Sequence, residues 1–299
     1  MSQEQRTLLT RGMMAFAAVL VVGLVVGTFA DLQIARTVYA PNNPLVTFVS
    51  SLGLLPLAYP ACILMGVLAQ RSLASRKSQA LRMAGAVLCA VLAMAFGALI
   101  TKATLSVLDG FGGMVGSELP TNYRLVIGCV VGAGLCAVGY NAGKANDSED
   151  LARRVLMVVV VMAVSFAVVE LVKSFMARPR PRLLFAGPEG VEFSPWYHRT
   201  EGAKELMAAL GIEKDAFKSF PSGHSLQAAA FLTAFYGLSL VWPGMREKLG
   251  IALVVEVVFA LLVMSCRMIL GAHFLSDVST GALVSVVAFL VLMRLEGRD

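Results

Sequence analysis

Two of the three histidines in this chain lie in polar clusters that interrupt otherwise apolar sequence. His273 precedes Asp277 by four residues, so one helical turn would bring the carboxylate beside the imidazole and let it hold one ring N–H. The other ring nitrogen would then be a better nucleophile or base. Arg267, six residues before His273, carries a guanidinium whose fork suits phosphate oxygens. This cluster predicts chemistry at phosphorus, although a histidine and an aspartate at this spacing more often form a structural hydrogen bond.

A second cluster is typical of the start of a helix. Pro221 and Ser222 precede an apolar run, so the backbone N–H groups of Gly223 and His224 would point outward at the positive end of the helix dipole. A helix start of this kind binds phosphate. Gly223 would allow close approach of the backbone, and Ser222 would add a hydroxyl. An ordinary capped helix is the alternative.

A third cluster supplies further positive charge. Lys173 ends an apolar segment, and Arg180 follows beyond prolines that must end the helix. Glu170 is expected to pair with Lys173 on one helical face. Taken alone, this cluster could equally be a membrane edge that contacts lipid headgroups. Together the three clusters offer positive charge, an attacking group and a proton donor, which is the set that a phosphoryl group in transfer requires.

In order and spacing, these residues resemble the three signature motifs of the type 2 phosphatidic acid phosphatase superfamily. The resemblance covers about residues 155–293. It implies that His273 is the nucleophile that forms a phosphohistidine, that Asp277 orients it, and that His224 protonates the leaving oxygen. It also implies a phosphate site made of Lys173, Arg180, Ser222, Gly223 and Arg267. The matching motifs are Lys173-x6-Arg180-Pro181, Pro221-Ser222-Gly223-His224 and Arg267-x5-His273-x3-Asp277.

The resemblance implies no metal and no other cofactor. The sequence agrees, because no set of Asp, Glu and His ligands is clustered on the face that carries the motifs. Two features depart from the family pattern. Cys266 stands between Ser265 and Arg267 where the family commonly has Ser-Arg, so Ser265 is assigned no role. The first motif follows the fifth apolar segment and not the third, so residues 83–143 are expected to form an added helical hairpin.

The composition predicts a membrane protein. Of 299 residues, 58% are hydrophobic and 15% are charged, which is not the balance of an ordinary globular protein. Helices of about 20 residues cross the ~30 Å hydrocarbon layer, and these runs are too continuous for barrel strands. We predict an all-α polytopic membrane helix bundle in one domain, residues 1–299, with about eight transmembrane helices. A six-helix phosphatase core would carry the added hairpin, and residues 155–293 would form the catalytic part. The apolar segments are 12–30, 37–70, 83–101, 125–143, 155–169, 225–245, 249–266 and 278–293.

The fifth and eighth of these segments are short, so six or seven crossings are the alternatives. Glu256 lies inside the seventh segment, where a lone carboxylate costs about 2.5 to 3.5 kcal/mol on insertion scales. It is expected to face the bundle and to make a buried hydrogen bond.

The distribution of basic residues predicts the orientation. Basic residues follow the second, fourth and sixth segments, which marks that side as cytoplasmic. Both termini are expected on the same side and the motifs on the outer face, in a bacterial inner membrane. The outer connection, about residues 174–221, is more basic than this rule expects, and anion binding would explain the excess. The cytoplasmic basic residues are Arg71, Arg76, Lys77, Arg82, Lys144, Arg153, Arg154, Arg246 and Lys248.

The predicted activity is removal of a phosphate from a membrane lipid. Candidate substrates are phosphatidic acid, phosphatidylglycerol phosphate, polyprenyl diphosphate and lipid A phosphates. A phosphotransferase that uses the same histidine is one alternative, and a non-catalytic anion or lipid transporter is another. A transporter would need cations at mid-depth in several helices, where this sequence has only Glu256 as a charged residue. The net charge of +6 does not indicate nucleic acid, and the sequence specifies no oligomeric state.

Overall fold

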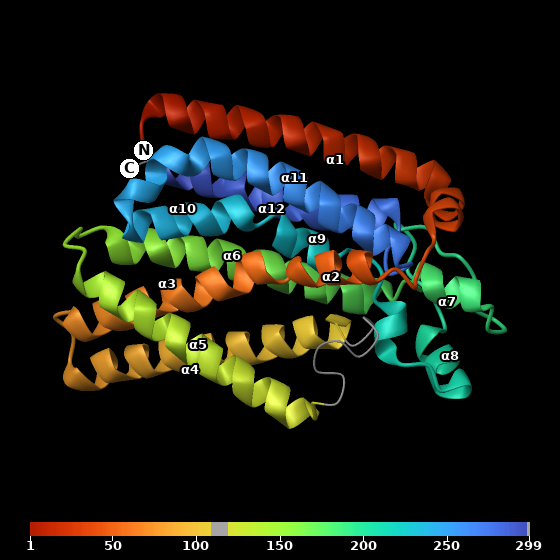
Figure 1. Ribbon diagram of the computed structural model, residues 1–299, viewed down its shortest axis with the longest axis horizontal. Coiled ribbons are helices and arrows are strands. Elements are labelled where there is room, and N and C mark those ends of the chain that lie inside the picture. The colour runs from red at the N-terminus through yellow and green to blue at the C-terminus, as the bar shows by residue number, and fades with distance from the viewer. Residues whose placement is uncertain (109–118, 298–299) are drawn as a thin grey trace.

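The computed structural model describes residues 1–108 and 119–297 of the chain. In these ranges the regular secondary structure is helical, and no strand occurs. The long helices run side by side in one elongated bundle, and the start of α1 (Gln3–Val38) lies beside the end of α12 (Leu275–Glu296), as Figure 1 shows. The prediction of an all-α membrane bundle is confirmed.

Seven helical spans in the described ranges are long and apolar enough to cross a membrane. They correspond to seven of the eight predicted segments. Two of these spans contain two α-helices in series, because short breaks occur at residues 53–54 and 177–180, and a third begins with a 3-10 helix, Pro243–Lys248, directly before α11. The helices concerned are α1, α2 (Pro44–Leu52) with α3 (Leu55–Ala74), α4 (Gln79–Leu108), α5 (Thr121–Lys144), α6 (Leu151–Met176) with α7 (Pro181–Ala186), α11 (Leu249–Ile269) and α12.

The eighth predicted segment, residues 225–245, is not one continuous helix. It is divided into α9 (Gly223–Ala228) and α10 (Phe231–Val241). A break in a helix leaves N–H groups without partners, and the carboxylate of Glu256 on α11 accepts the N–H of Leu232 at 2.5 Å. The buried hydrogen bond expected for Glu256 is therefore confirmed. It satisfies the backbone at the broken segment, which still runs along the bundle between the long helices (Figure 1).

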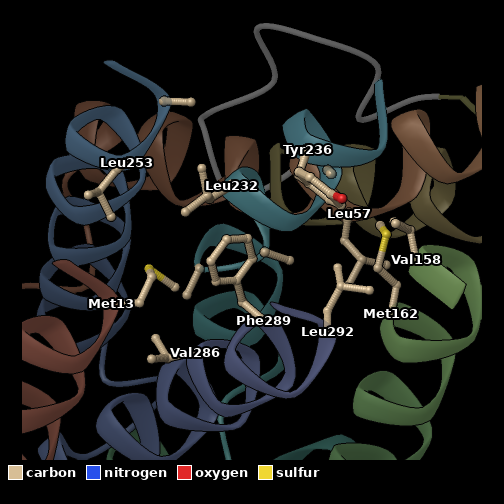
Figure 2. Close-up of a cluster of buried hydrophobic side chains, with 14 of the residues drawn as sticks. Met13, Leu57, Val158, Met162, Leu232, Tyr236, Leu253, Val286, Phe289 and Leu292 are labelled. Carbon is tan, nitrogen blue, oxygen red and sulfur yellow. The ribbon is translucent and has the colours of Figure 1, made fainter. Parts of the chain in front are cut away.

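A hydrophobic core joins the helices that carry the sequence motifs. Met13 of α1, Leu232 of α10, Leu253 of α11 and Phe289 of α12 point into one cluster, and Val158 of α6 belongs to the same core (Figure 2). In a membrane the alternative neighbours of such side chains are lipid tails, so close van der Waals packing between the helices stabilises this core. This packing fixes the relative positions of the helix ends that form the site.

Helices α4 and α5 pack against α3 on the side of the bundle away from α1 (Figure 1). Their contacts are made backbone to backbone through glycines. A Cβ atom at Gly139 would overlap the carbonyl oxygen of Ile63, and one at Gly97 would overlap that of Gly128. Small residues of this kind let membrane helices approach closely. The two helices cover the described part of the range 83–143, and the prediction of an added hairpin on a six-helix core stays a prediction.

Candidate active site

The predicted site residues lie at the end of the bundle away from the two termini, where α7 and α8 (Ala203–Leu210) are found (Figure 1). Four elements bring them together. The end of α6 and the link after it carry Lys173 and Arg180, and α9 begins at Gly223. The end of α11 carries Arg267, and the turn before α12 carries His273.

The side chain of His273 is buried, with 1% of the residue exposed. Its Nδ1 lies 2.6 Å from the carbonyl oxygen of Ser219, so Nδ1 carries the hydrogen and donates it. The lone pair therefore belongs to Nε2. The hydrogen bond expected from Nδ1 to Asp277 is not formed, because the nearest carboxylate oxygen is 3.8 Å away. The carbonyl group of Ser219 therefore fixes the tautomer of His273, a role that the sequence had suggested for Asp277.

Asp277 is nevertheless close to His273, and its oxygens are occupied by other donors. Oδ1 accepts from Nη1 of Arg178 at 2.5 Å. Oδ2 accepts from the hydroxyl of Ser219 at 2.5 Å and from the N–H of Phe274 at 2.8 Å. Ser219 thus joins the two site residues, since its hydroxyl binds Asp277 and its carbonyl binds His273. Asp277 fixes the segment that holds the histidine, and its negative charge lies near the ring.

Arg178 is a fully buried cation at this end of the molecule, and no role was predicted for it from the sequence. Its Nη2 lies 3.0 Å from Oδ2 of Asp31 on α1, its Nη1 donates to Asp277, and the side chain is 0% exposed. Its guanidinium lies 4.2 Å from the centre of the Phe274 ring. A buried cation between two buried carboxylates ties α1 to α12. Asp31, the charged residue that directly follows the first apolar segment, was the signal in the sequence that could have indicated this pair.

Lys173 meets the start of α9. Its Nζ pairs with Oε1 of Glu170 at 2.7 Å, which confirms the predicted pair. A Cβ atom at Gly223 would lie 2.6 Å from the same Nζ, so a side chain at this position would displace the ammonium. The lysine charge therefore lies directly against the backbone at which a phosphate was predicted to bind.

Arg180 is held in place by protein groups. Its Nε donates to the carbonyl oxygen of Asp215 at 2.8 Å, its Nη2 to Oδ1 of the same residue at 3.0 Å, and its Nη1 to the carbonyl of Ala272 at 3.2 Å. Burial would raise the pKa of Asp215, but Arg180 and Arg182 hold that pKa below its ordinary value. Asp215 was not singled out from the sequence. Asp215 holds the guanidinium of Arg180, which was predicted to bind phosphate, in one position.

At the start of α9, Ser222 acts as the helix cap. Its hydroxyl oxygen accepts the N–H of Ser225 at 3.3 Å and the hydroxyl of that residue at 3.0 Å. Both bonds use lone pairs of the oxygen and not its own O–H, so the phosphate contact expected for Ser222 stays a prediction. The N–H groups of Gly223 and His224 have no partner within the helix. Nε2 of His224 is buried and makes no hydrogen bond in the part of the chain that the structure describes.

A cavity of about 480 Å³ joins three of the predicted residues, Arg180, His224 and Arg267. Arg267 donates from Nη1 to the hydroxyl of Ser50 at 3.1 Å, while its Nε has no hydrogen-bond partner in residues 1–108 and 119–297. Three arginines, with Arg182 as the third, and a histidine with an unpaired Nε2 therefore line one space. Such a space can receive a phosphate and give a proton to a group bound there. The remaining described lining residues are Pro41, Thr47, Ala103, Ser106, Val107, Asp215, Leu270 and Ala272.

The electrostatic environment keeps the imidazole of His273 neutral. Burial lowers its pKa, Asp277 opposes that shift, and the positive charges of Arg180 and Arg267 lower the pKa further, to about 3. A neutral imidazole with its hydrogen on Nδ1 has a lone pair on Nε2 at any physiological pH. The site can therefore supply a nitrogen nucleophile without prior loss of a proton.

The pKa of His273 gives stability a definite pH dependence. An unfolded histidine titrates near pH 6.5, and the folded one near 3, so between these values the unfolded chain binds more protons. The free energy of unfolding should then rise with pH across this interval. We expect the thermal midpoint of unfolding in detergent to decrease as the pH is lowered from about 7 to about 4, and to decrease less in His273→Gln. Equal slopes in the two proteins would contradict the burial of a neutral imidazole.

A family model described as PAP2 superfamily matches residues 154–299. The matched range contains all eight of the predicted site residues and excludes α1 to α5. No curated protein and no solved structure matches the chain.

Proposed function

The chain is, through residues 154–299, a member of the PAP2 superfamily, and on that premise we propose that it hydrolyses the phosphate ester of a membrane lipid through a phosphohistidine at His273. Family membership and the membrane-spanning helices support a phosphatase-type function on lipids. The observation that carries the proposal is the pairing of a buried, neutral His273 with a cavity that Arg180, His224 and Arg267 line.

The reaction starts when the substrate phosphate enters among the cations. Arg180, Arg267 and Lys173 offset its charge, and the N–H groups of Gly223 and His224 add hydrogen bonds. Nε2 of His273 forms the N–P bond while the bond from phosphorus to the lipid oxygen breaks. His224, protonated next to the bound dianion, gives its proton from Nε2 to that oxygen.

The second half of the reaction reverses these roles. A water molecule gives its proton to His224 and attacks phosphorus, the N–P bond breaks, and phosphate leaves. Throughout, the guanidinium and ammonium groups carry out the charge stabilisation that metal ions provide in many other phosphoryl-transfer enzymes. No metal is required by this scheme.

The substrates that we propose are phosphorylated lipids, with phosphatidic acid, phosphatidylglycerol phosphate, polyprenyl diphosphate and lipid A phosphates as candidates. The site lies at one end of the bundle, at the level where a lipid phosphate would meet water. The basic loops that predict the cytoplasmic side lie at the other end, which supports an outward-facing site in a bacterial inner membrane.

The test is phosphate release from these four lipids by the purified full-length protein in detergent. We expect at least one lipid to be hydrolysed, at a rate that EDTA does not change. Inhibition by EDTA that added Mg²⁺ or Zn²⁺ reverses would contradict the metal-free mechanism. No release from any of the four lipids would contradict the proposed substrate class.

A further inference from the structure

We propose that the end of α4 nearest the site binds the leaving group, which is the part of the lipid esterified to the phosphate. The hairpin of α4 and α5 would then select substrates by the size of that group. The inference rests on the proposed function and extends it to Ala103, Ser106 and Val107. These residues are outside the range matched by the family model. They nevertheless border the same cavity as Arg180, His224 and Arg267.

The two histidines differ in their relation to this cavity. His224 lines it, whereas His273 is not among its described lining residues. In an in-line displacement the attacking and leaving atoms lie on opposite sides of phosphorus. Because His224 is the proposed proton donor, the leaving oxygen lies on its side. The group attached to that oxygen therefore extends into the cavity, toward α4.

The lining of the cavity combines charged and apolar side chains. Arg180, Arg267 and His224 supply cations and the proposed proton donor. From α4 come Ala103, Val107 and the hydroxyl of Ser106. About 480 Å³ is within the usual size of a small-ligand site and exceeds what one phosphate needs. The cavity thus suits a phosphate and the first, apolar part of the group that it esterifies.

The wall that α4 provides is fixed by close packing. Gly97 of α4 faces Gly128 and Gly132 of α5, and added Cβ atoms at these positions would overlap backbone atoms of the opposite helix. Near the cavity, Ala103 packs with Leu54 and Ile100 in a small core. A wall held by backbone contacts does not yield to an oversized ligand, so the size of the α4 side chains limits the leaving group.

The experiment compares two substrates in one variant. Val107→Trp puts a larger side chain on the part of the lining that α4 supplies, and dioctanoyl phosphatidic acid and p-nitrophenyl phosphate are the substrates. We expect kcat/KM to fall about 10-fold to 200-fold for the lipid, because a pocket that is too small by a few carbon atoms discriminates on this scale. For the small soluble ester we expect little change. Leu99→Trp, at a position on α4 that is 61% exposed and does not line the cavity, is the matched control.

Equal rates of Val107→Trp and the unmodified protein on the lipid would overturn the inference. So would a parallel loss on both substrates in a variant that elutes from size exclusion like the unmodified protein, because α4 would then act on the phosphate and not on the leaving group. Ser106→Trp, at an exposed position, repeats the comparison independently of Val107. Failure of the proposed function is distinguishable, since His273→Ala would then keep its activity on p-nitrophenyl phosphate.

Discussion

Replacing His273 with alanine is expected to lower kcat/KM for lipid phosphate release by roughly 10⁴-fold or more, the scale seen when a covalent nucleophile is removed. The substitution leaves Arg180, Arg267 and His224 in place, so binding of the phosphate should persist while the N–P bond can no longer form. The measurement is phosphate release in detergent under identical lipid concentrations. A large fall in kcat with a small change in KM is the expected pattern.

The matched control is His198→Ala. His198 is the third histidine of the chain and lies in an exposed loop beside Tyr197, outside the cavity. We expect its removal to leave the rate within about a factor of two, because surface substitutions away from a site usually have small effects. Comparable rates for His273→Ala and His198→Ala would exclude His273 as the nucleophile.

The second large effect is expected on stability. Arg178→Met removes the cation between Asp31 and Asp277 and leaves two buried carboxylates without a counter-charge. Breaking a buried ion pair in this way costs about 3 to 5 kcal/mol of the free energy of unfolding. Activity should fall with it, because Asp277 and Ser219 fix the segment that carries His273.

Arg182→Met provides the comparison for Arg178→Met. The side chain of Arg182 is 48% exposed, and its Nη2 is 3.5 Å from Asp215. Exposed pairs contribute up to about 1 kcal/mol. We expect thermal denaturation in detergent to show a large loss for the first variant and a small one for the second. Equal midpoints in the two variants would mean that the ion pairs of Arg178 with Asp31 and Asp277 do not stabilise the site.

The residues with local signals were the ones that the sequence could indicate. Ser222 before an apolar run predicts a helix start, and His273 four residues before Asp277 predicts neighbours on one turn. Both expectations depend only on residues close in the chain. The Glu170 and Lys173 pair, three residues apart, was predictable for the same reason.

The partners that lie far apart in the chain could not be predicted in this way. Arg178 binds a carboxylate 147 positions earlier, and no periodicity indicates that Asp31 turns inward at that level. Asp277 was expected to hold His273, but Ser219, 54 positions before the histidine, accepts its hydrogen bond. The choice between competing partners depends on tertiary packing, which local spacing does not encode.

The break between α9 and α10 shows the same limit in the fold. Residues 225–245 have the composition of a continuous membrane helix, so hydropathy predicted one. The carboxylate of Glu256, from the next long helix, stabilises the start of α10 instead. Likewise, the sequence indicated a hairpin over residues 83–143, but only the packing of α4 reveals that its end borders the cavity of the motif residues.

The most direct test of the central claim is to trap the covalent intermediate. The full-length protein in detergent is mixed briefly with phosphatidic acid labelled with ³²P in its phosphate, and quenched in alkaline SDS, in which a phosphohistidine survives. We predict that label stays on the protein, that peptide mapping assigns it to His273, and that His273→Ala carries none. Turnover of the lipid without labelled protein, or label on any other residue, would contradict the account.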